Sequence, residues 1–125
     1  MILDTNAVSA ILAADPQIAS VLGPSAPHHL PVTVIGEYQF GILGSRYAEM
    51  LTAGLQRLES QSLVLPCDRE TADRYADVRH ELKQKGRPIP ENDVWIAALA
   101  RQHGLEIVSR DPHFDLVDGV RRIDW

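Results

Sequence analysis

Residues 1–12 of this chain, MILDTNAVSAIL, decide how the fold begins. Three apolar residues precede Asp4, and apolar residues then recur at the spacing of a helix. A short apolar run followed by such a segment is typical of a β-strand that leads directly into an α-helix. A junction of this kind needs no charge, so the carboxylate of Asp4 requires a role and partners from elsewhere in the chain.

The same alternation of short apolar runs and helical patterns continues to the end of the sequence. We expect strands near residues 1–3, 28–32, 63–66, 106–109 and 121–125. We expect helices near residues 5–14, 17–22, 34–43, 46–60, 69–85 and 92–103. Strands separated by helices predict an α/β fold with three layers, in which helices cover both faces of a mainly parallel sheet.

Five residues are suited to the ends of these helices. Thr33, Ser45 and Asp68 stand where an N-cap side chain is expected. Gly86 and Gly104 stand where a helix ends in a left-handed residue.

The composition is that of one soluble globular domain, and we expect residues 1–125 to form it. The chain is 45% hydrophobic and 23% charged, and no apolar run approaches the about 20 residues of a membrane span. No basic segment precedes an apolar run at the N-terminus, so a secretory signal is not expected. Cys67 is the only cysteine, which excludes an internal disulfide and favours the reducing cytoplasm.

The net charge of −5 constrains any nucleic-acid substrate. Proteins that hold nucleic acid by charge alone are usually basic. Contact with nucleic acid would therefore depend on local arginines or on bound cations. Arg46, Arg110, Arg121 and Arg122 are the candidates for steering RNA, although arginines scattered over a surface are common.

Four carboxylates are candidates for one site: Asp4, Glu37, Asp93 and Asp111. Asp4 and Asp111 follow expected strands, at the sheet edge where open α/β folds bind ligands. Glu37 lies in an apolar helix with Gly41 on the same face, where another backbone or a ligand can approach. Asp93 lies in the first turn of the most hydrophobic helix.

Each carboxylate also has an ordinary explanation: a first-turn acid for Asp93, a solvated side chain for Glu37, and a turn for Asp111 before Pro112. Carboxylates that converge on one edge repel each other unless protons or cations compensate. Oxygen ligands favour Mg²⁺ or Mn²⁺. Two such ions about 3.5–4 Å apart can activate a water and stabilise the leaving oxygen of a phosphodiester.

Polar residues beside these acids are expected to support the site. Thr5, Asn6 and Ser109 can do so through hydroxyl and amide hydrogen bonds. Alternatively, Thr5 or Asn6 is simply the N-cap of the first helix.

Four stretches resemble, in order, the PIN domain, and more closely the VapC toxins of bacterial type II toxin–antitoxin modules: LDTN (3–6), GEYQFGI (36–42), NDVWIAALA (92–100) and VSRDPHF (108–114). The resemblance implies a Rossmann-like α/β/α domain that acts as a metal-dependent endoribonuclease. It makes Asp4 and Asp93, which follows Asn92, the principal metal ligands. Glu37 and Asp111 match the other acidic positions, and Asp115 is an alternative to Asp111.

The resemblance also implies partners. It predicts a homodimer that cleaves RNA with Mg²⁺ or Mn²⁺ and is neutralised by an antitoxin that blocks the acidic groove, often with an arginine. DNA would then be recognised only through the antitoxin. Water activated at the metal would leave a 5′-phosphate and a 3′-hydroxyl.

Other functions compete with this one. A receiver domain or a haloacid-dehalogenase phosphatase also places aspartates at strand ends, but both need a late lysine, and the only lysines are Lys83 and Lys85. The phosphatase also needs an aspartate where this chain has Asn6. A PIN nuclease of RNA processing and a catalytically silent interaction module remain alternatives.

Histidines and aromatic residues receive no catalytic role from the sequence. The histidines match no zinc motif, and His113 is interpreted as packed or solvated. Trp95 and Trp125 are expected to pack in the core or at its edge. For four other apolar side chains, core packing and a dimer or antitoxin surface stay open: Tyr38, Phe40, Tyr47 and Met50.

Overall fold

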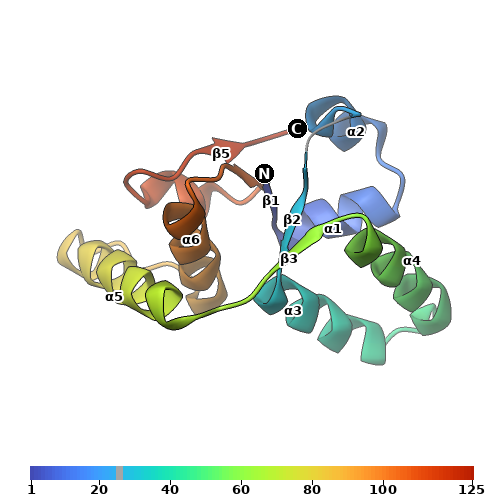
Figure 1. The fold of residues 1–125 in the computed structure, drawn as a ribbon, viewed down its shortest axis with the longest axis horizontal. Coiled ribbons are helices and arrows are strands. Elements are labelled where there is room, and N and C mark those ends of the chain that lie inside the picture. Colours follow the sequence, from blue (N-terminus) through green and yellow to red (C-terminus); the bar gives the residue numbers. More distant parts are fainter. Residues whose placement is uncertain (25–26) are drawn as a thin grey trace.

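The computed structural model describes residues 1–24 and 27–125 and has five strands and six α-helices (Figure 1). The strands are β1 (Ile2–Leu3), β2 (His29–Pro31), β3 (Leu63–Leu65), β4 (Ile107–Val108) and β5 (Arg122–Ile123). The helices are α1 (Thr5–Leu12), α2 (Pro16–Leu22), α3 (Val32–Leu43), α4 (Ala48–Ser60), α5 (Arg69–Gln84) and α6 (Glu91–His103). A 3₁₀ turn, η1 (Pro112–Leu116), follows β4.

All five strands are parallel, in the order β3-β2-β1-β4-β5, which confirms the predicted fold class. β1 is central, with Ile2 opposite His29 on one side and Ile107 on the other. Leu3 pairs with Val108. The residues that follow these two strands therefore meet at one edge of the sheet.

Helices cover both faces of the sheet. α5 packs against α6 on one side, and α1, α3 and α4 pack together on the other (Figure 1). α6 has the longest run of buried residues, from Ile96 to Ala100, which explains why it is apolar on most sides. Among the residues that the structure describes, no helix is long and apolar enough to cross a membrane.

Most of the predicted helix ends are confirmed. Asp68 caps α5 through a reciprocal pair of hydrogen bonds with Thr71. Gly86 and Gly104 have φ angles of 66° and 64°, a conformation that favours glycine. The predictions for Thr33 and Ser45 are wrong. α3 begins at Val32 with Pro31 as its N-cap, and α4 begins at Ala48 with Tyr47 as its N-cap.

Candidate active site

Asp4 lies at the end of β1 and is 5% exposed. Its Oδ1 accepts a hydrogen bond from the backbone N–H of Thr5 (2.7 Å). Its Oδ2 accepts hydrogen bonds from Asn6 Nδ2 (2.8 Å) and Ser109 Oγ (2.6 Å). Burial raises the pKa of Asp4 above its ordinary value, and the hydrogen bonds from Ser109 and Thr5 counteract this rise.

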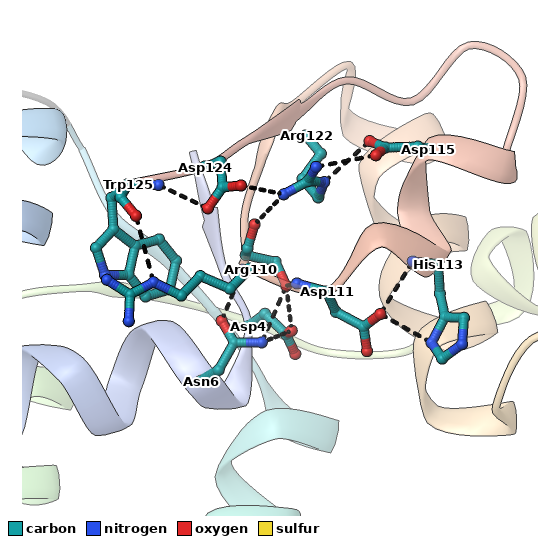
Figure 2. Close-up of polar contacts among 10 residues, drawn as sticks. Asp4, Asn6, Arg110, Asp111, His113, Asp115, Arg122, Asp124 and Trp125 are labelled. Carbon is teal, nitrogen blue, oxygen red and sulfur yellow. Dashed lines mark hydrogen bonds and ion pairs between the residues drawn. The ribbon is translucent and has the colours of Figure 1, made fainter.

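Asn6 and Ser109 join the start of α1 to the segment after β4. Asn6 Nδ2 also donates to Ser109 Oγ (3.0 Å), and Asn6 Oδ1 accepts from the backbone N–H of Arg110 (3.1 Å). Ser109 Oγ in turn accepts from the backbone N–H of Asp111 (2.9 Å). Figure 2 shows this network between Asn6, Asp4 and the Arg110–Asp111 segment. The alternative that Thr5 or Asn6 caps α1 is wrong, because Asp4 itself is the N-cap.

Asp93 lies in the first turn of α6 and is 8% exposed. Burial, with the charges of Asp111 and Asp4 as smaller causes, raises its pKa to about 6. Its Oδ2 is buried and makes no hydrogen bond with the residues that the structure describes. A buried, unpaired carboxylate oxygen is costly unless a positive charge or a proton compensates.

Asp111 is the N-cap of η1 and faces Asp93 through His113. Asp111 Oδ1 accepts a hydrogen bond from the backbone N–H of His113 (2.9 Å). The ring Nδ1 of His113 lies 2.8 Å from Asp111 Oδ1 and 3.3 Å from Asp93 Oδ2. One potential ligand atom from each of these three residues lies within 4.8 Å of the other two.

His113 was missed by the sequence analysis, which gave it no role. The available signal was its place two residues after Asp111, at the start of a tight turn. In such a turn the carboxylate of the first residue accepts a hydrogen bond from the backbone N–H two residues on, which brings the third residue beside it. Figure 2 shows the His113 ring facing the Asp111 carboxylate.

Glu37 lies exposed on α3 and is joined to the site by one contact. Its Oε2 accepts a hydrogen bond from Thr5 Oγ1 (2.9 Å). Its charge contributes to the raised pKa of Asp4. Gly41, one turn later, faces open space, since a Cβ there would meet no atom within 4 Å. The space beside Glu37 is therefore not filled by another backbone.

Two of the supporting residues lie apart from the carboxylate cluster. Both oxygens of Asp115 accept hydrogen bonds from Arg122 at 2.9 Å, as Figure 2 shows. Arg122 also donates to the backbone carbonyl of Ser109 (3.0 Å). Asp115 thus acts through Arg122 on the segment that carries Asp111. Asn92 is exposed in the first turn of α6, and its side chain makes no hydrogen bond to the carboxylates among the described residues.

Comparisons with known proteins identify the family of this chain. The PIN domain model matches residues 1–120. A VapC ribonuclease of Sinorhizobium fredii is 31% identical over 121 residues, which cover 89% of this chain and 86% of the relative. This chain belongs to the VapC ribonucleases of the PIN domain family.

Two further VapC proteins are similar to this chain. A tRNA(fMet)-specific endonuclease VapC of Shigella flexneri is 34% identical over 90 residues, 71% of this chain and 68% of the relative. The solved structure of DNA-bound VapBC from Salmonella typhimurium contains a chain that is 27% identical, with a TM-score of 0.87 and coverage of 99% of this chain and 96% of that chain. The family and fold predicted from the sequence are thereby confirmed.

The donor set of this carboxylate cluster fits a hard divalent cation. Asp93 and Asp111 supply two negative charges on neighbouring oxygens, and Asp93 Oδ2 lacks a hydrogen-bond donor. Asp4 Oδ1 accepts only one of the hydrogen bonds described above, so this oxygen keeps a lone pair for a further partner. Carboxylate oxygens of this kind are the ligands that Mg²⁺ and Mn²⁺ prefer.

Proposed function

We propose that this VapC-family chain is an endoribonuclease that requires Mg²⁺ or Mn²⁺ and acts as the toxin of a toxin–antitoxin pair. The single observation that carries the proposal is the convergence of Asp4, Asp93 and Asp111 on the edge of the sheet. Asp4 and Asp93 are buried residues, and the pKa of both carboxyl groups is raised. Such an arrangement is favourable only when a cation or a proton compensates.

In the proposed mechanism, Asp93, Asp111 and Asp4 hold the cation. When bound, a divalent cation would lower the pKa of a water molecule and neutralise charge on the phosphate. Glu37 would accept the proton of the attacking water, because it is exposed and Thr5 holds only one of its two oxygens. The water would attack phosphorus, the bond between phosphorus and the 3′-oxygen would break, and the 3′-oxygen would take a proton from solvent, so the products carry a 5′-phosphate and a 3′-hydroxyl.

A cation also explains how a chain with a net charge of −5 can take RNA as its substrate. All four candidate arginines already have protein partners: Arg121 pairs with Glu106, and Arg46 lies over the Tyr47 ring. Arg122 binds Asp115 and Asp124, and Arg110 lies 4.6 Å from the Trp125 ring and donates to the backbone carbonyl of the same residue. The cation, rather than these arginines, would therefore bind the scissile phosphate.

We further propose that the chain forms a homodimer and binds an antitoxin in the cytoplasm, as one PIN domain spanning residues 1–125. Similar structures are VapBC complexes, some of them on DNA, and DNA would reach this chain only through the antitoxin. Phe40, Tyr47 and Met50 are 79%, 53% and 66% exposed on the α3–α4 segment, whereas Tyr38 packs against the core. Exposed apolar side chains that lie together are typical of an interaction surface.

The test is cleavage of total RNA by the purified chain, freed of any partner, with Mg²⁺, with Mn²⁺ and with EDTA. Asp4→Asn and Asp93→Asn are compared with Asp73→Asn, a control on the exposed face of α5. We expect discrete cleavage that needs the cation, Asp4 and Asp93, with 5′-phosphate ends. Products with a 2′,3′-cyclic phosphate would contradict the mechanism, and no cleavage with either cation would favour the silent interaction module.

Because the Shigella flexneri relative is named for tRNA(fMet), tRNA is the first defined substrate to try. Cleavage of tRNA alone would indicate that this chain and that relative act on the same class of RNA. Cleavage of other RNA would show a different target for the same chemistry.

A further inference from the structure

His113 occupies a position in the site that the mechanism above does not use. Its Nδ1 and the Oδ2 of Asp93 are both buried atoms, although almost half of the His113 side chain is exposed. Neither atom makes a hydrogen bond with the described residues, even though they lie only 3.3 Å apart. The two atoms form an ion pair when the ring is protonated, and a cation that binds both atoms is the other way to compensate them.

The ring nitrogen is not needed to orient Asp111. The backbone N–H of His113 already donates to Asp111 Oδ1 at 2.9 Å. The ring Nδ1 lies 2.8 Å from the same oxygen but in a direction that does not form a hydrogen bond. The two carboxylate oxygens therefore flank the nitrogen, and its bonding direction is left for another group.

We propose that Nδ1 of His113, with Asp93 Oδ2 and Asp111 Oδ1, is a ligand of the cation, and that this nitrogen makes the site prefer Mn²⁺ to Mg²⁺. The proposal rests on the metal-dependent function proposed above. Metal–ligand bonds of about 2.1 Å at right angles separate neighbouring ligand atoms by about 3 Å. The separations of 2.8 and 3.3 Å between the nitrogen and the two oxygens fit this spacing.

The preference follows from the chemistry of the donors. Mg²⁺ takes oxygen ligands and keeps much of its water, whereas first-row transition ions bind imidazole nitrogen well. Asp93 and Asp111 neutralise a divalent ion, and a neutral imidazole adds a ligand without adding charge. Asp4 is not part of this group of three, because none of its oxygens lies within 4.8 Å of the ligand atoms of all three residues.

The test uses the full chain and two histidine variants, His113→Ala and the control His80→Ala on the exposed face of α5. Pulsed electron paramagnetic resonance of the Mn²⁺-loaded protein detects a bound nitrogen directly. Titration calorimetry gives the affinities for Mn²⁺ and Mg²⁺. RNA cleavage with each cation is measured in parallel.

We expect a ¹⁴N coupling in the wild-type chain and in His80→Ala but not in His113→Ala. We expect His113→Ala to lose Mn²⁺ affinity by at least about tenfold and Mg²⁺ affinity by less than about threefold. Absence of the nitrogen coupling in the wild-type chain, or an equal loss of affinity for both cations, would overturn the proposal. RNA cleavage that needs a cation but shows no nitrogen coupling overturns only this inference, whereas absence of cation binding overturns the proposed function as well.

Discussion

Replacing Asp93 by asparagine is expected to stabilise the fold at neutral pH when no divalent cation is present. The carboxylate is 8% exposed and faces Asp111 and Asp4, and its Oδ2 has no hydrogen-bond donor. An asparagine removes the negative charge and keeps nearly the same shape. If Asp93 holds a cation as proposed, its charge lowers the stability of the cation-free chain, as charged active-site residues often do.

The magnitude follows from the pKa of Asp93, which is raised from an ordinary 3.8 to about 6. A tenfold change in proton affinity corresponds to about 1.4 kcal/mol, so the charge costs the folded state about 3 kcal/mol at pH 7.5. Because the folded state keeps its proton to higher pH than the unfolded state, stability falls as pH rises from about 4 to about 6. Near pH 4 the cost is below about 1 kcal/mol.

The assay is thermal and urea unfolding in EDTA at pH 7.5 and pH 4. A buried amide also needs hydrogen-bond partners, which offsets part of the gain from removing the charge. We therefore expect Asp93→Asn to raise the free energy of unfolding by about 2 kcal/mol at pH 7.5, or Tm by about 6–10 °C for a chain of this size. This gain should shrink by about 2 kcal/mol at pH 4. Asp73→Asn, whose side chain is 64% exposed, should change stability by less than about 0.5 kcal/mol.

Two results would refute this reasoning. One is an Asp93→Asn variant that is no more stable than the wild-type chain at pH 7.5. The other is a gain that does not change with pH. Mn²⁺ added to saturation should stabilise the wild-type chain and leave Asp93→Asn almost unchanged, since only the native wild-type site binds the ion.

Three further predictions concern the contacts around the site. Ser109→Ala removes the donor 2.6 Å from the buried Asp4 Oδ2 and should lower the unfolding free energy in urea by about 1–3 kcal/mol; an unchanged midpoint would contradict this. Arg122→Lys loses the paired hydrogen bonds to Asp115 and should cost about 1–2 kcal/mol by the same assay, whereas wild-type stability would show that the paired geometry has no effect. Glu37→Gln should reduce RNA cleavage at least about 100-fold and change stability by less than about 0.5 kcal/mol, because the side chain is exposed; wild-type cleavage rates would exclude Glu37 as the base.

The sequence by itself determined the order of the elements and several of their ends. Apolar periodicity separates strands from helices locally, and residues such as Asp68, Gly86 and Gly104 act within one turn of their own helix. It also placed Asp4 and Asp111 at one edge, because parallel strands bring their carboxyl ends together. These inferences need only local geometry and one rule of sheet topology.

Only the tertiary structure decided which side chains touch. The pairing of Leu3 with Val108 brings Asp4 and Ser109 within hydrogen-bonding distance across about a hundred residues of sequence. A shift of this register by one residue would point these side chains to opposite faces of the sheet. Asp4 is the N-cap of α1 because the strand ends directly at the start of the helix.

His113 shows where sequence reasoning stops. A histidine beside a phenylalanine in a turn matches no motif, and its role depends on α6 placing Asp93 within 3.3 Å of its ring. Local sequence fixes the turn that directs His113 toward Asp111, but the distance to Asp93 is set by how α6 packs against η1. Packing of this kind depends on the side chains of the whole core, so it cannot be predicted from any single stretch of the sequence.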